Sequence, residues 1–431
     1  MSRAGHAAAL ALGLAAVAAQ PAFDGRQPAP GRWVGSWYAA PAARVDSAAP
    51  PTGTSGQSLL HFRNQTLRQI AHLTLGGTRL RVVVANTFGT KELRVGAASV
   101  ALRDRDAVIV PGSAHRLSFG GSGDVVVPAG GTLTSDPVDL AAPDFADLAI
   151  DLYLPGDTAA MQSPVTMHAA SWQTGYVSPP GNHAGTPSMP VEATTRYRRG
   201  DGLESATWFF LARVEVIAPP NAYAIVAIGD SITDGTASGL DANHRWPDRL
   251  ARRLTGAGMR TAVLNAGIGG NRVLVEGNGP SALSRFDRDV LDQPGASYVL
   301  VLEGINDIGQ AREQPQPGAV ELIAAHKALI ERAHARGLRI FGATLTPFQG
   351  ANYWTSAGEA KRQALNEWIR TSKAYDAVLD FDAAVRDPDQ PSKLLARYDP
   401  GDHLHLNAAG YEAAADTIDL ALFRPERNHD R

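Results

Sequence analysis

The hydrophobic pattern of this 431-residue chain changes at Pro219-Pro220, and the change limits the folds that the chain can adopt. Before these prolines, apolar residues recur at every second position; after them, short apolar runs alternate with stretches of helical periodicity. A period of two is typical of half-buried strands, and alternation of strands with helices is typical of a parallel sheet. The sequence therefore predicts two domains, each with its own core: a β domain over residues 31–218 and an α/β domain over residues 221–425.

The first domain is predicted from short alternating runs. Leu80, Val82 and Val84 share one face of such a run, whereas Arg79 and Arg81 lie on the other. Gly-Gly and Pro-Gly pairs separate successive runs, as turns do. Short half-buried strands at this spacing predict an antiparallel β-sandwich or jelly roll.

The second domain is predicted from five apolar runs and four helical patterns. We interpret as strands the runs 224–228, 261–265, 297–302, 338–343 and 377–380. Helical periodicity is found near 245–256, 317–336, 357–372 and 407–422. Strands and helices in this order predict a three-layer α/β domain, with helices on both faces of a parallel sheet.

The composition excludes several classes of function. The formal net charge is −3, with 40 basic and 43 acidic residues and no dominant basic segment, so we expect no nucleic-acid partner. Cysteine is absent, which excludes disulfides and thiolate metal sites. Hydrophobic content of 44% is that of an ordinary globular protein and leaves the oligomeric state open.

The amino terminus resembles an export signal. An apolar run from Ala7 to Ala19 follows Arg3, and small residues at Ala16, Ala18 and Ala19 offer a cleavage site. The run is shorter than the roughly 20 residues that span a bilayer. We therefore expect a signal peptide at residues 1–19, export of the mature chain and no transmembrane segment.

A serine follows the first strand of the α/β domain directly. The run 224–228 ends in Gly229-Asp230-Ser231, and Gly235 follows four residues later. Such a turn places a hydroxyl at the carboxyl end of a strand, where open α/β sheets bind their ligands. Alone, the segment is equally typical of a turn in which Asp230 and Ser231 bond their own backbone.

Later strand ends supply the groups that a nucleophilic serine needs. Asn265 to Gly270 follows the second strand and is rich in glycine, which permits close approach of backbone N–H groups. Asn306 follows the third strand and offers a side-chain amide. Asp402 lies three residues before His405, within reach of its ring. A base, an orienting carboxylate and oxyanion donors are the partners of a catalytic serine.

Other interpretations compete at single positions. His403 is also close to Asp402, but bonding to its immediate neighbour would turn it away from a triad, so His405 is preferred. A metal cluster of Asp399, Asp402, His403 and His405 would leave the serine unexplained. The glycines at 267–270 do not continue as a dinucleotide motif, because Arg272 stands where the last glycine is needed.

Together these segments resemble the SGNH hydrolase superfamily, also called GDSL esterases and lipases, over residues 221–425. Its four blocks match Gly229-Asp230-Ser231, Asn265 to Gly270, Gly304-Ile305-Asn306-Asp307 and Asp402 to His405, in the family order. The resemblance implies a flavodoxin-like sheet, Ser231 as nucleophile, His405 as base and Asp402 as triad acid. It further implies an oxyanion hole of Ser231, Gly270 and Asn306, with no cofactor and no metal.

A narrower resemblance covers nearly the whole mature chain. Trp33 to Trp37 and Arg63 to Gln69 are similar to segments of secreted, XynE-like arylesterases and acylhydrolases. This implies a secreted serine ester hydrolase acting on acetyl or aryl esters of small molecules or polysaccharides. A lysophospholipase or lipase-type acylhydrolase, or a glycan-binding protein whose β domain is the main functional part, remain alternatives. Tyr353 and Trp354 are open to two interpretations, lining the substrate pocket or packing in the core.

Overall fold

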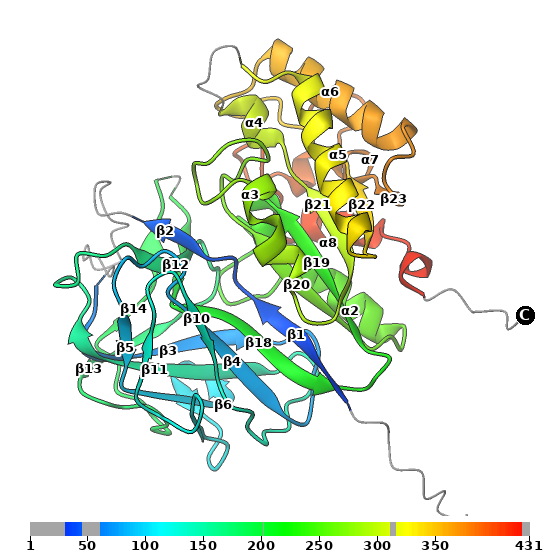
Figure 1. Ribbon diagram of the computed structural model, residues 1–431. Coiled ribbons are helices and arrows are strands. Elements are labelled where there is room, and N and C mark those ends of the chain that lie inside the picture. The colour runs from blue at the N-terminus through cyan, green and yellow to red at the C-terminus, as the bar shows by residue number, and fades with distance from the viewer. Residues whose placement is uncertain (1–30, 45–60, 201, 311–315, 425–431) are drawn as a thin grey trace, which may run out of the picture.

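The computed structural model describes residues 31–44, 61–200, 202–310 and 316–424. The expected signal peptide at residues 1–19 lies outside the described residues. Figure 1 shows a β-rich part formed by the earlier strands and an α/β part formed by the later elements, packed side by side. Among the helices in the described ranges, none is long and apolar enough to cross a membrane.

The β domain contains eighteen strands within the described residues. They are β1 (Arg32–Tyr38), β2 (Ala42–Arg44), β3 (Arg63–His72), β4 (Leu80–Ala85), β5 (Leu93–Val95), β6 (Ala97–Arg105), β7 (Val108–Ile109), β8 (His115–Leu117), β9 (Val125–Val127), β10 (Thr132–Thr134), β11 (Asp147–Asp157), β12 (Val165–Ala169), β13 (Tyr176–Pro180), β14 (Ala193–Thr194), β15 (Tyr197–Arg198), β16 (Glu204–Ser205), β17 (Thr207–Phe209) and β18 (Leu211–Ala218).

These strands pair antiparallel in two main sheets. One has the order β1-β18-β4-β10, and the larger has the order β14-β13-β3-β11-β6-β7, with β8 paired to β6. A smaller sheet, β17-β12-β2, lies on the side of the α/β domain. The antiparallel β-rich region that the period of two predicts is therefore present.

Strand β4 shows how the alternation is used. Leu80, Val82 and Val84 are fully buried in the main core. On the opposite face, Arg81 donates to the buried Glu215 at 2.6 Å and lies over the Trp33 ring. Glu215 is fully buried, and its pairing with cations makes that burial possible. This second face is therefore covered as well, and the strand is more buried than its sequence pattern indicates.

The α/β domain contains a five-stranded sheet and helices on both of its faces. Its strands are β19 (Tyr223–Gly229), β20 (Thr261–Gly267), β21 (Ala296–Leu302), β22 (Arg339–Ala343) and β23 (Ala377–Leu379). Its helices are α1 (Ser231–Asp234), α2 (Trp246–Gly256), α3 (Ala282–Phe286), the π-helical turn η1 (Asp287–Leu291), α4 (Ile305–Gly309), α5 (Ala319–Ala335), α6 (Ser356–Thr371), α7 (Phe381–Val385), the 3-10 turn η2 (Ala396–Tyr398), α8 (Ala408–Asp416) and the 3-10 turn η3 (Leu420–Phe423).

All strands of this sheet are parallel, in the order β20-β19-β21-β22-β23. This is the flavodoxin-like order, in which the chain reverses direction across the sheet between β20 and β21, beside β19. Helix α2 packs on β20 and α8, whereas α5 packs on β22, α3 and α6 (Figure 1). The carboxyl ends of β19, β20 and β21 therefore meet at one edge.

The last predicted helix, 407–422, is shorter than expected. Helix α8 ends at Asp416, and a separate 3-10 turn follows. The Thr417 hydroxyl donates to the Ala414 carbonyl at 2.7 Å, and the Asp419 side chain accepts from the Ala421 N–H at 2.8 Å. Side chains that bond the backbone in this way end one helix and begin the next turn.

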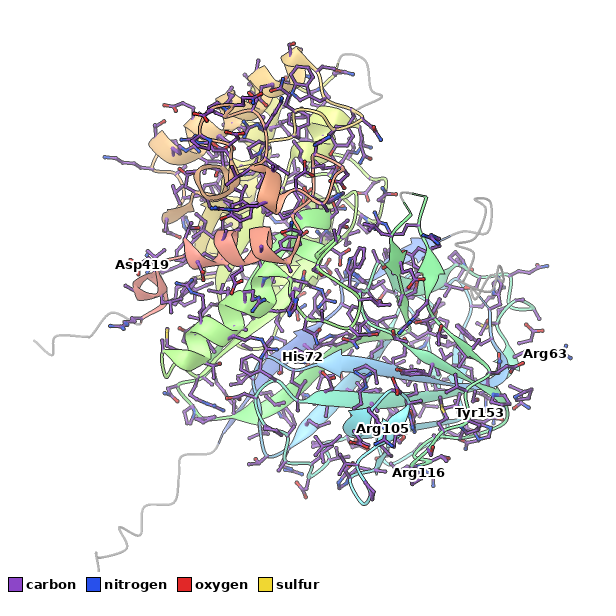
Figure 2. The ribbon with its side chains drawn as sticks, turned by 180° about the vertical axis from the view of Figure 1, so that it is seen from behind. Arg63, His72, Arg105, Arg116, Tyr153 and Asp419 are labelled. Atoms are coloured by element: carbon purple, nitrogen blue, oxygen red, sulfur yellow. The ribbon has the colours of Figure 1, made fainter. Side chains whose placement is uncertain are left out.

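The prediction of two separate cores is wrong. One buried apolar cluster runs from the β domain into the α/β domain, so that Val34 and Leu264 belong to the same core. Strand β1 packs along β20, and the Gly35 N–H donates to the Pro294 carbonyl at 2.9 Å. At the same boundary, Arg252 of α2 donates at 3.4 Å to His72 of β3, which is labelled in Figure 2. The domains are joined as one packed body.

Candidate active site

Ser231 lies at the start of α1, immediately after β19. The side chain of Asp230 caps this helix by accepting from the Ile232 N–H at 2.8 Å. A Cβ atom at Gly229 would collide with Thr233 and with the carbonyl of Leu302, so only glycine fits between this turn and β21. The turn therefore fixes the serine at the carboxyl edge of the sheet, 6% exposed.

His405 and Asp402 approach Ser231 from the loop before α8. The Ser231 Oγ and the His405 Nε2 are 2.8 Å apart, and the other ring nitrogen, Nδ1, is 2.5 Å from Asp402 Oδ2. The structure thus brings the three residues into one line of hydrogen bonds. This is the geometry of a nucleophile, its base and the carboxylate that orients the base.

Asp402 is held as a carboxylate. Its Oδ1 accepts from the backbone N–H groups of Leu404 and His405, both at 3.0 Å. Burial works to raise the pKa of this carboxyl, but the hydrogen bond and charge of the His405 ring, with the two N–H donors, lower the pKa to about 2. An ionised Asp402 fixes the Nδ1–H tautomer of His405, which leaves Nε2 free to accept the serine proton.

The competing histidine faces elsewhere. His403 Nδ1 is 2.5 Å from Asp399 Oδ2, and the side chain of His403 is 51% exposed. Each of the two carboxylates thus binds one histidine. Within the described ranges, no group of three or more histidine or acidic residues is arranged to hold a metal ion.

The expected oxyanion donors line the same cavity as Ser231. Gly270 has a φ of 75°, and a Cβ there would meet the Asn278 side chain, so the loop requires glycine at this point. Asn306 donates one amide hydrogen to the Asn271 carbonyl at 3.0 Å, and its oxygen accepts from Gln310 at 2.7 Å. These two bonds orient the amide and leave its second hydrogen for a ligand.

Both domains line the cavity at this site, which has a volume of about 590 Å³. The α/β domain contributes Ser231, His405, Gly270 and Asn306. The wall from the β domain consists of the residues Ala42, Ala43, Met167, His168, Ala169, Ala170, Tyr197 and Arg199. Sequence reasoning missed this wall, because no motif marks it and its residues come from three separate segments.

Tyr353 and Trp354 do not line this cavity. The Tyr353 hydroxyl is 3.5 Å from the Asn306 side-chain oxygen, and its ring packs against Gly309 and Phe348. Of the two interpretations of this pair, packing is the one that the structure favours.

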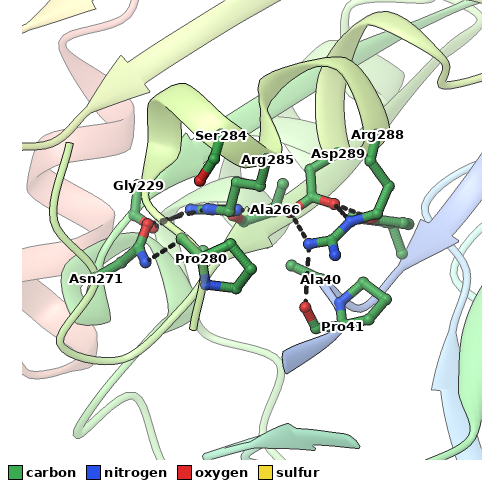
Figure 3. Close-up of polar contacts among 12 residues, drawn as sticks. Ala40, Pro41, Gly229, Ala266, Asn271, Pro280, Ser284, Arg285, Arg288 and Asp289 are labelled. Carbon is green, nitrogen blue, oxygen red and sulfur yellow. Dashed lines mark hydrogen bonds and ion pairs between the residues drawn. The ribbon is translucent and has the colours of Figure 1, made fainter. Parts of the chain in front are cut away.

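A buried arginine ties together the ends of two strands of the parallel sheet (Figure 3). Arg285 donates to the carbonyls of Gly229 and Ala266 at 3.0 and 2.6 Å, and to the Asn271 side chain at 3.0 Å. Asn271 in turn accepts from Asn306 through its carbonyl oxygen. Arg285 therefore fixes the ends of β19 and β20 and, through Asn271, the amide of Asn306.

Three further carboxyls, those of Asp230, Glu303 and Asp307, are buried in the α/β domain. Asp307 accepts from the N–H groups of Val273 and Leu274, at 2.8 and 3.0 Å. Burial nevertheless raises the pKa of Asp307 to about 6. Burial and the nearby Asp230 raise the pKa of Glu303 well above its usual range, and burial likewise raises that of Asp230. None of the three lines the cavity, so we assign them a structural rather than a catalytic role.

Residues 227–413 match the GDSL-like lipase/acylhydrolase family. No curated protein sequence matches the chain. Among solved structures, a protein assigned to the lipolytic G-D-S-L family from Desulfitobacterium hafniense is 22% identical; the match covers 45% of this chain and 96% of that one, with a TM-score of 0.36.

Two other solved structures are similar over the same share of the chain. One is a catalytic mutant of an acetylxylan esterase from Geobacillus stearothermophilus, 21% identical, with 45% and 91% covered and a TM-score of 0.36. The other is a GDSL-like lipase from Bacteroides thetaiotaomicron, 17% identical, with 46% and 87% covered and a TM-score of 0.35. By its family match, the segment 227–413 is a GDSL-like lipase/acylhydrolase domain, and the chain is a carboxylic ester hydrolase.

Proposed function

We propose that this chain hydrolyses short-chain acetyl or aryl esters through an acyl-enzyme formed on Ser231. The observation that carries the proposal is the continuous line from Ser231 Oγ to His405 Nε2, at 2.8 Å, and from His405 Nδ1 to Asp402, at 2.5 Å. The family match and the adjoining cavity support the same reaction class.

Acylation begins when Ser231 Oγ attacks the ester carbonyl carbon and its proton passes to His405 Nε2. Asp402 stabilises the imidazolium that results, because it already binds the opposite ring nitrogen. The carbonyl oxygen becomes an oxyanion, which the N–H groups of Ser231 and Gly270 and the Asn306 amide stabilise. When the tetrahedral intermediate collapses, the C–O bond to the alcohol breaks, and the alcohol leaves with the proton from Nε2.

Deacylation repeats these steps with water. His405 Nε2 takes a proton from water as its oxygen attacks the acyl carbon, and the same three donors receive the second oxyanion. Collapse returns the proton to Ser231 Oγ and releases the carboxylic acid. Each proton that moves in this cycle passes between Ser231, His405, water and the released alcohol, so the steps balance without a further reactant.

The lining of the cavity supports a short acyl group and a polar alcohol. Small side chains of the β domain, Ala169 and Ala170 among them, line the cavity together with the amides of Asn278 and Gln310. Amides and backbone groups are suited to the hydroxyls of a sugar, so we propose esters of small molecules or of carbohydrate. The apolar run after Arg3 supports the further proposal that the chain is exported in the manner of XynE-like enzymes.

The test is hydrolysis of p-nitrophenyl acetate by the wild type and by Ser231→Ala. Removal of the nucleophile is expected to lower kcat by roughly 10⁶-fold. Ser238→Ala is the matched control, because its hydroxyl is buried in the same segment and has no hydrogen-bond partner among the described residues. Equal rates for the wild type and Ser231→Ala would reject the serine mechanism.

A panel of p-nitrophenyl esters from acetate to palmitate separates the proposal from its alternatives. We expect kcat/KM to fall as the acyl chain lengthens. A maximum at long chains would favour a lipase-type acylhydrolase. Release of acetate from acetylated xylan by the wild type, and not by Ser231→Ala, would establish a carbohydrate substrate, whereas xylan binding without hydrolysis would favour a glycan-binding protein.

A further inference from the structure

A second histidine–aspartate pair lies at the boundary between the domains. His168 Nε2 is 3.1 Å from Asp234 Oδ1, and each side chain is 4% exposed. His168 belongs to β12, and Asp234 is the last residue of α1, which begins at Ser231. The pair therefore joins the β domain directly to the helix that carries the nucleophile.

Both ring nitrogens of His168 face hydrogen-bond acceptors. Nδ1 is 2.9 Å from the Ala40 carbonyl oxygen, so this nitrogen carries a hydrogen. Nε2 faces a carboxylate, so the ring carries a second hydrogen and a positive charge. Burial opposes this charge, but the Asp234 carboxylate prevails and raises the pKa of His168. A ring that already holds both hydrogens cannot act as a general base.

The second oxygen of Asp234 reaches the loop that follows β20. Asp234 Oδ2 accepts from the Gly269 N–H at 3.0 Å, one residue before Gly270. A Cβ atom at Gly267 would collide with the backbone of Asp234, so this loop packs directly against α1. A path of hydrogen bonds thus runs from His168 through Asp234 to the peptide beside the expected oxyanion donor.

The β domain also holds the segment that continues from α1. Arg245 donates to the Ser171 carbonyl at 2.5 Å and to the Asp234 carbonyl at 3.1 Å. Asp241 accepts from the Thr174 N–H at 2.6 Å and has a φ of 60°, in the left-handed region that aspartate adopts more readily than most residues. The β domain therefore holds this segment at Asp241 and Arg245 as well as at Asp234.

We infer that His168 is a positioning residue, through which the β domain orients Asp234 and, by way of Gly269, the N–H of Gly270 toward the oxyanion. The inference rests on the proposed function, because it takes Gly270 as an oxyanion donor. The β domain then contributes to catalysis by positioning a backbone donor of the α/β domain, in addition to lining the cavity.

Two amide substitutions separate the bonds of His168. Glutamine places an amide nitrogen as many bonds from Cβ as Nε2, so His168→Gln keeps a donor for Asp234. Asparagine does so for Nδ1, so His168→Asn keeps only the bond to Ala40. For p-nitrophenyl acetate we expect His168→Asn to lower kcat roughly 10- to 100-fold with little change in KM, since displacing catalytic groups by about 1 Å costs about 10²-fold. His168→Gln should stay within about threefold of the wild type on the same argument.

Asp234 provides a second pair of variants should His168→Asn fail to fold. Asp234→Asn retains an oxygen for the Gly269 N–H and offers a donor to a neutral His168 ring, so it should retain most of kcat. Asp234→Ala loses both bonds and should resemble His168→Asn. Combining Asp234→Ala with His168→Asn should add little to either loss, because both break one path.

Equal kcat values for the asparagine and glutamine variants at His168, or for the alanine and asparagine variants at Asp234, would overturn the inference. Melting temperatures of all variants separate a loss of folded protein from a loss of turnover. Activity in Ser231→Ala would instead reject the proposed function. If Ser231→Ala is inactive but the two His168 variants have equal kcat values, only the positioning role of His168 is rejected.

Discussion

Two histidine–aspartate pairs meet the helix that begins at Ser231: one lies within the α/β domain, and the other joins the β domain to the last residue of the helix. His405 and Asp402 come from a loop of the α/β domain, with side chains 10% and 37% exposed. His168 and Asp234 meet at the domain boundary, where both side chains are 4% exposed. Both pairs consist of a histidine and an aspartate. They differ in the partner of the ring nitrogen that does not face the aspartate.

The partner of that nitrogen decides what each histidine can do. His405 Nε2 faces a serine hydroxyl, which can give up its hydrogen, so the ring can accept a proton. His168 Nδ1 faces the Ala40 carbonyl, which only accepts, so the ring stays doubly protonated beside Asp234. A carboxylate next to a histidine therefore does not identify a catalytic base until the other nitrogen is accounted for.

The largest expected effect that could break this comparison is at His405. His405→Ala removes the only base in contact with Ser231 Oγ among the described residues, and should lower kcat for p-nitrophenyl acetate by roughly 10⁵- to 10⁶-fold. His403→Ala is the matched control, because its ring binds Asp399 and is half exposed, and it should change kcat by less than about twofold. A larger loss at His403 than at His405 would reject the assignment of the base.

Asp402→Asn should have the next largest effect. The two backbone N–H donors would hold the amide oxygen, which turns the amide nitrogen toward His405 Nδ1. A donor at that position forces the hydrogen onto Nε2, so the ring could no longer accept the serine proton. We expect kcat to fall by roughly 10³- to 10⁴-fold, with the melting temperature lowered by no more than about 2–4 °C. Full activity in this variant would show that the carboxylate does not set the tautomer.

Sequence patterns predicted the His405 side of this comparison and missed the His168 side for a physical reason. Ser231, Asn306 and His405 each follow a strand or precede a helix that hydrophobic periodicity locates, and a parallel sheet brings such positions to one edge. The helix at 407–422 was predicted too long, because periodicity does not register the side-chain caps at Thr417 and Asp419.

The contact between His168 and Asp234 spans 66 residues and depends on how the two domains pack. In the sequence, His168 is one polar residue in a strand of a β domain, and Asp234 is one acidic residue after a serine. The single core that unites the domains was missed for the same cause, since periodicity describes one element at a time. The packing of two domains depends on surfaces formed by residues that are far apart in the sequence, so local patterns do not predict it.

The smallest expected effect is on how folding stability depends on pH, which differs between the two histidine–aspartate pairs. Burial and the charge of Arg245 lower the pKa of His168, but Asp234 outweighs them, so the pKa is raised in the folded state. The protonated His168 ring therefore stabilises the folded protein fully below the unfolded pKa of about 6.5. This stabilisation is lost as pH rises through the folded value. The pKa of Asp402 is lowered to about 2, so its stabilisation is complete above the unfolded value of about 3.9 and is lost as pH falls toward 2.

The two pairs should therefore lose their stabilisation in opposite directions of pH. Melting temperatures of the wild type, His168→Gln and Asp402→Asn from pH 3 to 9 test this, because every other titrating group is common to the three proteins. The deficit of His168→Gln should be largest at low pH and shrink on the alkaline side; that of Asp402→Asn should shrink only toward acid. Each deficit should be no more than about 2–4 °C, and smaller for the more exposed Asp402. A His168→Gln deficit that grew with pH would mean that the buried ring is neutral, and that its bond to Asp234 is made by a single shared hydrogen.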